Sequence, residues 1–272
     1  MPAAHLIRRT GLALLLAAFS AASSAPALAQ AQKAPAVSSS TYEPTSGQEG
    51  KDVVWVPTPQ VVVDKMLDMA KVTPSDFVID LGSGDGRTVI TAAKRGARAL
   101  GIEYNPDMVA LSKRNAEKEG VAGKAAFIKA DLFETDFSKA SVITMFLMPE
   151  INLKLRPKIL ALKPGTRVVS NSFNMGDWHA DETATLTSDA GCTTSWCTAL
   201  LWIVPVRVAG NHKLPQGELT LKQQFQTLSG TLRAEGRTVP IDRGIVRGEE
   251  ITFKAGGREY RGKMNGTRLE LR

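Results

Sequence analysis

Between residues 59 and 172 the sequence alternates between helical and strand-like patterns, and this alternation limits the chain to one broad class of fold. Thr58 and Pro59 start a helix expected over residues 59–70, and the apolar run 77–81 indicates a strand buried on both faces. The alternation predicts an α/β fold with a doubly wound, mostly parallel sheet covered by helices on both faces. Further helices are expected at 87–95, after the capping pair Asn105 and Pro106, and around 156–162 with a kink at Pro157; further strands are expected at 99–103, 126–129, 142–147 and 167–172.

The remainder of the chain has a different pattern. Segments 183–188 and 200–208 could form an antiparallel pair that completes the sheet. From Gly210 onward, glycines punctuate short alternating runs at 218–222, 249–254 and 258–263, which predicts a small all-β unit. The expected organisation is a signal peptide at 1–29, a flexible linker at 30–54, an α/β domain at 55–209 and a small basic β-rich domain at 210–272.

The first residues have the layout of a secretory signal. Arg8 and Arg9 precede an apolar run at 11–19, and small residues end at Ala29. The run is shorter than the roughly 20 residues that span a bilayer, so cleavage and export, to a periplasm, are favoured over an uncleaved membrane anchor. The mature chain is expected to have no transmembrane span, and residues 30–54 lack apolar periodicity, as in a tether.

The two cysteines and the charge distribution fit an exported protein. In an oxidising compartment Cys192 and Cys197 would form a disulfide closing a short loop, with two free buried thiols as the alternative. No metal site is expected, because neither His179 nor His212 lies at a ligand-like spacing from this pair. The formal charge is +7, and from His212 onward 12 Lys and Arg face 7 Asp and Glu. This basic unit could dock to an anionic envelope component.

The stretch DLGSGDGR, residues 80–87, follows the first strand directly. Its glycines, Gly82, Gly84 and Gly86, allow close approach of a ligand, but the spacing is GxGxG rather than the GxGxxG of dinucleotide sites. Asp80 and Asp85 would repel a phosphate. A cationic ligand without phosphate, S-adenosylmethionine, would instead be attracted.

Two further acids follow the next strands. Glu103 is placed to accept both ribose hydroxyls of that ligand, and Asp131 to lie near its adenine amino group. Each acid also has a structural interpretation: Asp80 bonded to its own loop amides, Glu103 and Asp131 exposed to solvent, and Asp85 capping the following helix.

Residues 55 to about 180 resemble a class I methyltransferase, and more narrowly the lysine methyltransferases that include the enzymes of the mitochondrial ATP synthase c subunit and of the adenine nucleotide translocase. The matching motifs are VPTP at 56–59, DLGSGDGR at 80–87, GIEYNP at 101–106, ADLFETD at 130–136, FLMP at 146–149, and VVSNSF followed by Trp178. The resemblance implies that Thr58, otherwise a plain helix cap, helps close over the cofactor. The candidate cofactor-binding residues are Thr58, Asp80, Gly82, Ser83, Gly84, Asp85, Gly86, Glu103, Tyr104, Asn105, Asp131 and Leu132.

The resemblance implies an S-adenosylmethionine-dependent N-methyltransferase whose acceptor is a protein lysine. Phe146 and Pro149 are the candidate catalytic residues, since the loop they bound would offer an aromatic face and backbone carbonyls to the acceptor; a hydrophobic strand end is the alternative. A cofactor-fold binding module without turnover and a small-molecule methyltransferase remain alternatives. Nucleic acid is not an expected partner, because the basic unit has few aromatic residues for stacking: Phe225, Phe253 and Tyr260.

Overall fold

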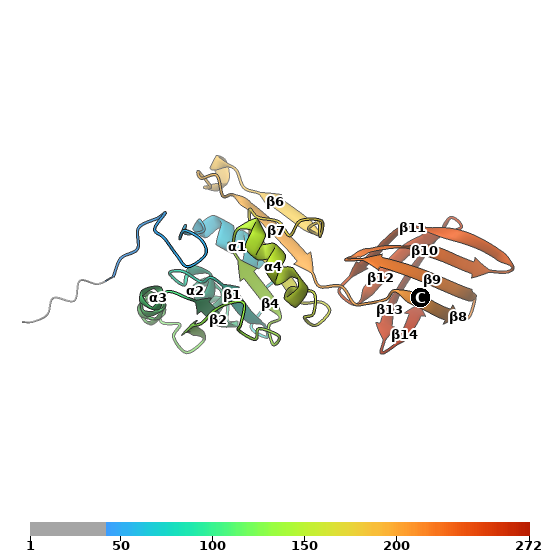
Figure 1. Ribbon diagram of the computed structural model, residues 1–272, viewed down its shortest axis with the longest axis horizontal. Coiled ribbons are helices and arrows are strands. Elements are labelled where there is room, and N and C mark those ends of the chain that lie inside the picture. The colour runs from blue at the N-terminus through green and yellow to red at the C-terminus, as the bar shows by residue number, and fades with distance from the viewer. Residues whose placement is uncertain (1–41) are drawn as a thin grey trace, which may run out of the picture. The chain divides into compact units, whose positions relative to one another are not determined.

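The computed structural model describes residues 42–272, and within them the chain forms two seven-stranded sheets (Figure 1). The expected signal peptide, and residues 30–41 of the expected linker, lie outside the described residues. Each sheet has its own hydrophobic core. Only the first sheet has helices packed on it, so only that sheet has the layered α/β architecture.

The first sheet has the strand order β3-β2-β1-β4-β5-β7-β6. The five strands from β3 to β5 are parallel, and β7 and β6 complete the sheet in antiparallel pairing. The predicted fold class is therefore confirmed. The direction in which successive strands are added to the sheet reverses between β1 and β4. Ligands of such sheets bind at the carboxyl ends of the strands beside that point. The strands are β1 Phe77–Leu81, β2 Arg98–Glu103, β3 Ala125–Lys129, β4 Val142–Met145, β5 Arg167–Asn171, β6 Glu182–Thr185 and β7 Thr198–Ile203.

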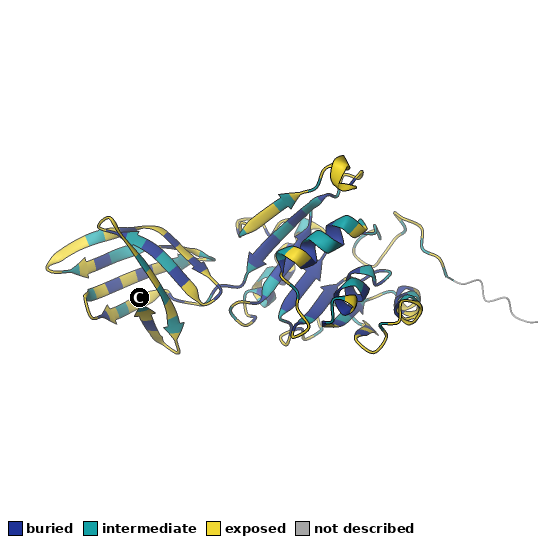
Figure 2. Cartoon of the chain, turned by 180° about the vertical axis from the view of Figure 1, so that it is seen from behind, coloured by how far each residue is buried: buried dark blue, intermediate teal, exposed yellow. Residues whose placement is uncertain are grey.

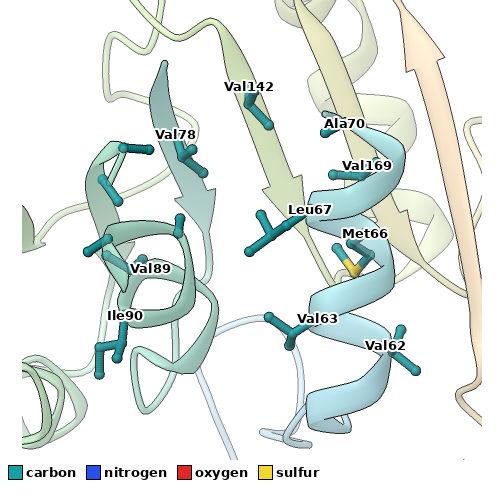
Figure 3. Packing of buried hydrophobic residues seen from close by; sticks show 14 of the residues in the cluster. Val62, Val63, Met66, Leu67, Ala70, Val78, Val89, Ile90, Val142 and Val169 are labelled. Carbon is teal, nitrogen blue, oxygen red and sulfur yellow. The ribbon is translucent and has the colours of Figure 1, made fainter. Parts of the chain in front are cut away.

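Helices cover both faces of this sheet. Apolar residues of α1, α2 and α3 share one buried cluster, and those of α4 belong to a second. The strands supply both clusters because successive side chains point to opposite faces: Val78 joins the first cluster and Ile79 the second. Figure 3 shows Leu67 of α1 pointing toward the strands that carry Val78 and Val142, and Figure 2 shows these central strands buried. The helices are α1 Gln60–Met69, α2 Arg87–Lys94, α3 Pro106–Lys118 and α4 Pro149–Ile159, with a short 3₁₀ turn η1 Ser188–Ala190.

Two helix starts differ from the sequence predictions. The expected helix around 156–162 begins seven residues earlier, at Pro149, and Pro157 lies inside its last turn. Proline fits the first helical position because its missing N–H would have no partner there. Thr58 does not cap α1: the residue before the helix is Pro59, and no side chain accepts a bond from the first turn. Asn105, by contrast, caps α3 as expected, with its Oδ1 2.9 Å from the Asp107 nitrogen.

The second sheet is an antiparallel meander in which each strand pairs with the next in sequence. Its buried residues alternate with exposed ones, and Leu219, Leu232 and Phe253 lie in its core. The last strand lies near the first, so the meander curls back on itself. The sequence predicted an all-β unit here but named only three of its strands. They are β8 Gly210–Leu214, β9 Gly217–Gln224, β10 Thr227–Ala234, β11 Arg237–Arg247, β12 Glu250–Ala255, β13 Arg258–Asn265 and β14 Arg268–Leu271.

Among residues 42–272, no helix combines the length and the apolar character needed to cross a bilayer.

Candidate active site

A cleft opens at the carboxyl ends of β1, β2 and β4, at the reversal of strand order. It encloses about 1060 Å³, counting space open to solvent. That volume is sufficient for a ligand of nucleoside size, since pockets for small ligands span roughly 300–1,000 Å³. Five parts of the described chain supply most of its lining: residues 48–58, which precede α1, the glycine turn after β1, the segment after β2, the segment after β3, and the end of β4.

The glycine turn adopts a backbone that other residues rarely adopt. Gly84 has φ +53°, and a Cβ there would lie 2.5 Å from the Trp55 Nε1, so the indole occupies the space that a side chain would need. Gly86 has φ +84° and immediately precedes α2. A Cβ at Gly86 would lie 2.8 Å from the Phe127 ring, and Gly86 does not line the cleft. Residue 86 is therefore a glycine because it packs against Phe127 of β3, and not because a ligand approaches it.

Ser83 lines the cleft, but its hydroxyl faces the sheet. The Oγ is buried without a hydrogen-bond partner, and a Cβ at Gly101 of β2 would lie 2.5 Å from it. The close packing against β2 explains why residue 101 is a glycine. Any contribution of Ser83 to a ligand therefore comes from its backbone in this conformation.

Asp80 is the buried acid of the cleft. Its side chain is only 6% exposed, and the Thr144 hydroxyl on the adjacent strand β4 donates a 2.6 Å hydrogen bond to its Oδ1. Burial, opposed by this bond and assisted by the nearby charges of Glu103 and Asp85, raises the pKa of Asp80 to about 7. Such a carboxylate lacks a compensating cation among the groups that surround it, so a cationic ligand would stabilise its charged form.

Asp85 has a partner within the chain. The Arg87 guanidinium forms an ion pair with it at 2.6 Å, and the Arg87 backbone nitrogen lies 3.2 Å from its Oδ1. The same guanidinium donates to the Thr58 carbonyl at 2.9 Å. The predicted helix-capping role of Asp85 thus holds for one backbone N–H only, and much of its charge is offset by Arg87. Asp80, which is buried and has no such partner, would be stabilised most by a cationic ligand.

Glu103 is held by the backbone around it. One carboxylate oxygen accepts from the Gly84 nitrogen and the other from the Asn105 nitrogen, both at 2.9 Å. This position excludes the interpretation of Glu103 as a solvent-exposed strand end. Each oxygen has a second lone pair for a ligand hydroxyl. Tyr104 and Asn105 also line the cleft, although the Asn105 side chain is engaged in capping α3.

Asp131 lies after β3 together with Leu132, and both line the cleft. The Lys51 ammonium donates to Asp131 Oδ2 at 2.5 Å, and the Phe133 nitrogen donates to Oδ1 at 2.8 Å. These hydrogen bonds, that from Lys51 first, lower the pKa of Asp131. Lys51 also lies over the Tyr104 ring, 4.7 Å from its centre. Asp131 lines the cleft as predicted; its side chain is 28% exposed, and a lysine from the preceding segment binds it.

We call residues 48–58 the strap; sequence reasoning placed Thr58 at its end in the site but missed residues 48–55. The sequence placed residues up to 54 in a flexible linker. The described part of that linker has no helix or strand, but the Gly47 nitrogen donates to the Trp55 carbonyl at 2.8 Å and the Trp55 nitrogen to the Gln48 carbonyl at 2.9 Å. This turn brings Lys51 and Trp55 to the cleft. The one available signal was Trp55, a large aromatic residue beside a polar, glycine-containing segment.

Of Thr58 and the two candidate catalytic residues, Thr58 and Phe146 line the cleft and Pro149 does not. Thr58 is buried at the cleft, and the Asn171 amide at the end of β5 lies 3.5 Å from its hydroxyl. Phe146 is half-buried and lines the cleft. Pro149 does not line it, because it begins α4 and its ring occupies the first helical position. Of the two residues expected to contact the acceptor, the structure therefore brings Phe146 to the cleft and leaves Pro149 beside it.

The chemistry of the lining suits an organic cation with hydroxyl groups. Asp80, Glu103 and Asp131 meet at one edge of the sheet, and Arg87 is directed at Asp85 and Thr58. No group of three or more His, Cys, Asp or Glu among residues 42–272 has the arrangement of a metal site. The site is therefore suited to bind a cofactor by charge and hydrogen bonding, with the glycine turn allowing close approach.

Comparison with known proteins identifies the family. The sequence profile described as the ANTKMT methyltransferase domain matches residues 80–182. A protein-lysine N-methyltransferase of Saccharolobus islandicus is 48% identical over 133 residues, which are 48% of this chain and 83% of that protein. The chain belongs to this methyltransferase family. The match includes the glycine turn, Glu103 and Asp131 and ends within β6, before the cysteine loop.

Two further relatives define how far the similarity extends. The human lysine N-methyltransferase of the ATP synthase c subunit is 35% identical over 143 residues, which are 52% of this chain and 59% of that protein. An RNA methyltransferase from Salinibacter ruber, solved in complex with S-adenosyl-L-homocysteine, is 46% identical, with a TM-score of 0.52, and the match covers 56% of this chain and 96% of that one. This enzyme is therefore an S-adenosylmethionine-dependent methyltransferase.

The residues of the cleft fit this cofactor. Asp80 offers a buried carboxylate without a cationic partner to a cationic centre, and Glu103 has free lone pairs for ribose hydroxyls. We expect Asp131 to face the adenine end, where Lys51 binds it and also lies over the Tyr104 ring.

We expect cofactor affinity to depend on pH through Asp80. Its pKa of about 7 in the folded protein, against 3.8 ordinarily, means that a cation binding the charged form must displace a proton below pH 7. The dissociation constant for S-adenosylmethionine should fall by up to about tenfold per pH unit between about pH 5.5 and 7 and then level off. Without cofactor, the raised pKa of Asp80 has the opposite pH dependence. It stabilises the folded state fully below pH 3.8, and this stabilisation is lost as the pH rises through about 7.

Calorimetric titration across this range measures the first effect. Asp80→Asn, which cannot titrate, should flatten the profile and weaken binding at pH 7.5. An unchanged slope in Asp80→Asn would show that another group is responsible.

The contact of Gly84 with Trp55 gives a second prediction. Gly84→Ala places a Cβ against the indole and forces alanine into a left-handed conformation, so the strap or the turn must move. We expect at least a tenfold loss of affinity for S-adenosylhomocysteine by calorimetry. Gly123→Ala is the matched control, because Gly123 has nothing within 4 Å of its would-be Cβ and no positive φ. Equal affinities for the two variants would contradict the close approach at Gly84.

Proposed function

We propose that this enzyme transfers a methyl group from S-adenosylmethionine to the side-chain nitrogen of a lysine in a protein. The observation that carries the proposal is the 48% identity to the S. islandicus protein-lysine N-methyltransferase over 83% of that protein. Relatives named as lysine N-methyltransferases of the ATP synthase c subunit and of the adenine nucleotide translocase support it. Because the chain spans about three fifths of the human relative and about half of the mouse translocase enzyme, their particular substrates are not carried over.

The chain's own residues have three tasks in such a reaction. When bound, the cofactor would supply an electrophilic methyl carbon to the lysine nitrogen, with the carbon–sulfur electron pair kept by sulfur and the amine proton passing to water. Asp80 and Glu103 hold the cofactor by charge and hydrogen bonds. The strap, through Trp55, covers the glycine turn and limits the access of water. Phe146 offers the acceptor an apolar surface beside the cleft, so the protein acts mainly by positioning.

We infer that the enzyme works outside the cytosol. Cys192 and Cys197 form a disulfide, which is typical of oxidising compartments, and the first 29 residues have the pattern of a cleaved export signal. The excess of basic residues after His212 supports contact of the second sheet with anionic envelope material. Sedimentation of the mature chain with anionic and with neutral vesicles tests this contact. Binding is expected for the anionic vesicles alone and should weaken with salt; equal binding to both would contradict it.

RNA is the second candidate acceptor. It is favoured by the Salinibacter ruber chain, which is 46% identical over nearly its whole length and is described as an RNA methyltransferase. The lysine proposal is preferred because the curated relatives described above are named for lysine acceptors.

Labelled S-adenosylmethionine distinguishes the two acceptors. The purified mature chain is incubated with the donor and with an envelope extract, and separately with total RNA, and the label is located by mass spectrometry. We expect label on lysine nitrogen of an envelope protein, and strong loss of label with Asp80→Asn, which removes the charge that holds the cofactor. Label in RNA alone would assign the second function, and absence of label from both would contradict the proposed activity.

A further inference from the structure

Three aromatic rings from separate parts of the chain form a continuous patch beside the cleft. Phe146 follows β4, Phe173 follows β5, and Trp196 lies in the loop between β6 and β7. The ring centres are 5.8 Å apart for the two phenylalanines, and Trp196 lies 5.7 Å from Phe146 and 5.3 Å from Phe173. We call these three residues the aromatic wall. Since Phe146 lines the cofactor cleft, the wall extends from its rim toward the cysteine loop.

Core packing does not account for the aromatic wall. All three rings are half-buried, and none belongs to any of the three hydrophobic clusters of the described chain. The apolar surface that they share therefore remains partly open to solvent beside an enzyme cleft. Such a surface, next to convergent polar groups, is a usual feature of a ligand site.

The backbone that presents Phe173 is strained. Ser172 has φ +59°, which is uncommon for a residue with a side chain. The conformation is held by two 2.7 Å hydrogen bonds, from the Ser172 nitrogen to the Thr198 carbonyl and from the Phe173 nitrogen to the Asn171 carbonyl. Strain of this kind is kept where the surrounding structure fixes it, and it concentrates at functional sites. Here it places Phe173 in contact with both Phe146 and Trp196.

Trp196 is fixed by the disulfide. Cys192 and Cys197 are joined, and both are buried in the same cluster as Val62 of α1. Trp196 directly precedes Cys197, and its nitrogen lies 3.2 Å from the Thr194 hydroxyl. The loop is therefore attached to the core at both ends, next to the ring that it presents. These residues lie beyond the segment, 80–182, that matches the methyltransferase profile.

We propose that the aromatic wall is the subsite for the acceptor lysine and that the disulfide, by fixing Trp196, sets the affinity for that lysine. The inference rests on the proposed lysine methylation. Aromatic faces suit the side chain before and after transfer: they cover its aliphatic stem, and their negative π-faces attract the ammonium group of the lysine and of the methylated product. Reduction of the disulfide would weaken acceptor binding without changing cofactor binding.

Fluorine NMR tests acceptor binding without turnover. The chain has four tryptophans, so 5-fluorotryptophan labelling gives few signals, and Trp55→Phe and Trp196→Phe assign the two that matter. S-adenosylhomocysteine is added first, then Nα-acetyl-lysine methylamide, with the norleucine analogue and a short oligonucleotide as comparisons. We expect the Trp55 signal to move with the cofactor product and the Trp196 signal to move with the lysine compound. The proposal is overturned if the chemical shift of the Trp196 signal does not change with the lysine compound, or changes only with the oligonucleotide.

Kinetics with an oligolysine peptide test the affinity. Trp196→Ala should raise KM for the peptide about tenfold, with kcat within threefold and the dissociation constant for S-adenosylhomocysteine within twofold, and Trp196→Phe should recover most of the loss. Tyr260→Ala is the matched control, a half-buried stacked aromatic residue of the second sheet. The double variant Cys192→Ser, Cys197→Ser should raise KM in the same direction, with little further effect in the Trp196→Ala background.

The outcomes separate the two proposals. An unchanged KM in Trp196→Ala, while lysine is methylated, overturns the wall and leaves lysine methylation intact. If the peptide is not methylated at all, although S-adenosylhomocysteine binds, the proposed function fails, and the Trp196 signal still decides whether the wall binds lysine.

Discussion

A carboxylate buried at the end of a central strand governs this site. Asp80 lies between the glycine turn and Thr144, almost without exposure, and no cation of the described chain pairs with it. A buried charge of this kind is unfavourable unless it is neutralised by a proton or a counter-ion. The structure thus favours any cation that reaches the cleft and disfavours a polyphosphate. This electrostatic preference agrees with S-adenosylmethionine, a cation without phosphate, as the cofactor.

Contacts of the strap reduce the repulsion among the acids of the cleft. Arg87 binds both Asp85 and the Thr58 carbonyl, Lys51 binds Asp131, and Trp55 packs against Gly84. Acids gathered at one sheet edge repel one another, and two basic residues reduce that repulsion while attaching the strap. Lys51, 33% exposed on its side chain, holds its position by an ion pair that solvent weakens. The Arg87 side chain is equally exposed, at 32%, but Arg87 also donates a hydrogen bond to the Thr58 carbonyl, so the strap has two points of attachment on this side.

The acceptor side is formed in part by a loop outside the segment that matches the family profile. The profile match ends at residue 182, and the loop that carries Trp196 follows it. Six residues closed by a disulfide cannot form a core of their own, so the cysteines pack onto α1 and the half-buried tryptophan lies beside Phe173. The loop thereby presents an aromatic face next to the end of β5.

The sequence by itself determined the elements whose causes are local. The apolar run at β1, the cap at Asn105 and the left-handed glycines at 82, 84 and 86 depend on neighbouring residues, and the acids at strand ends follow from the parallel sheet. Only the tertiary structure decided which partner each group meets: Lys51 with Asp131, Arg87 with Thr58, Trp55 with Gly84, and Trp196 with Phe146. These contacts join residues up to 80 positions apart, and no periodicity in the sequence records them. Pro149 lies beside the cleft and not in it, and Thr58 does not cap α1, for the same reason, since helix starts are set by packing as well as by caps.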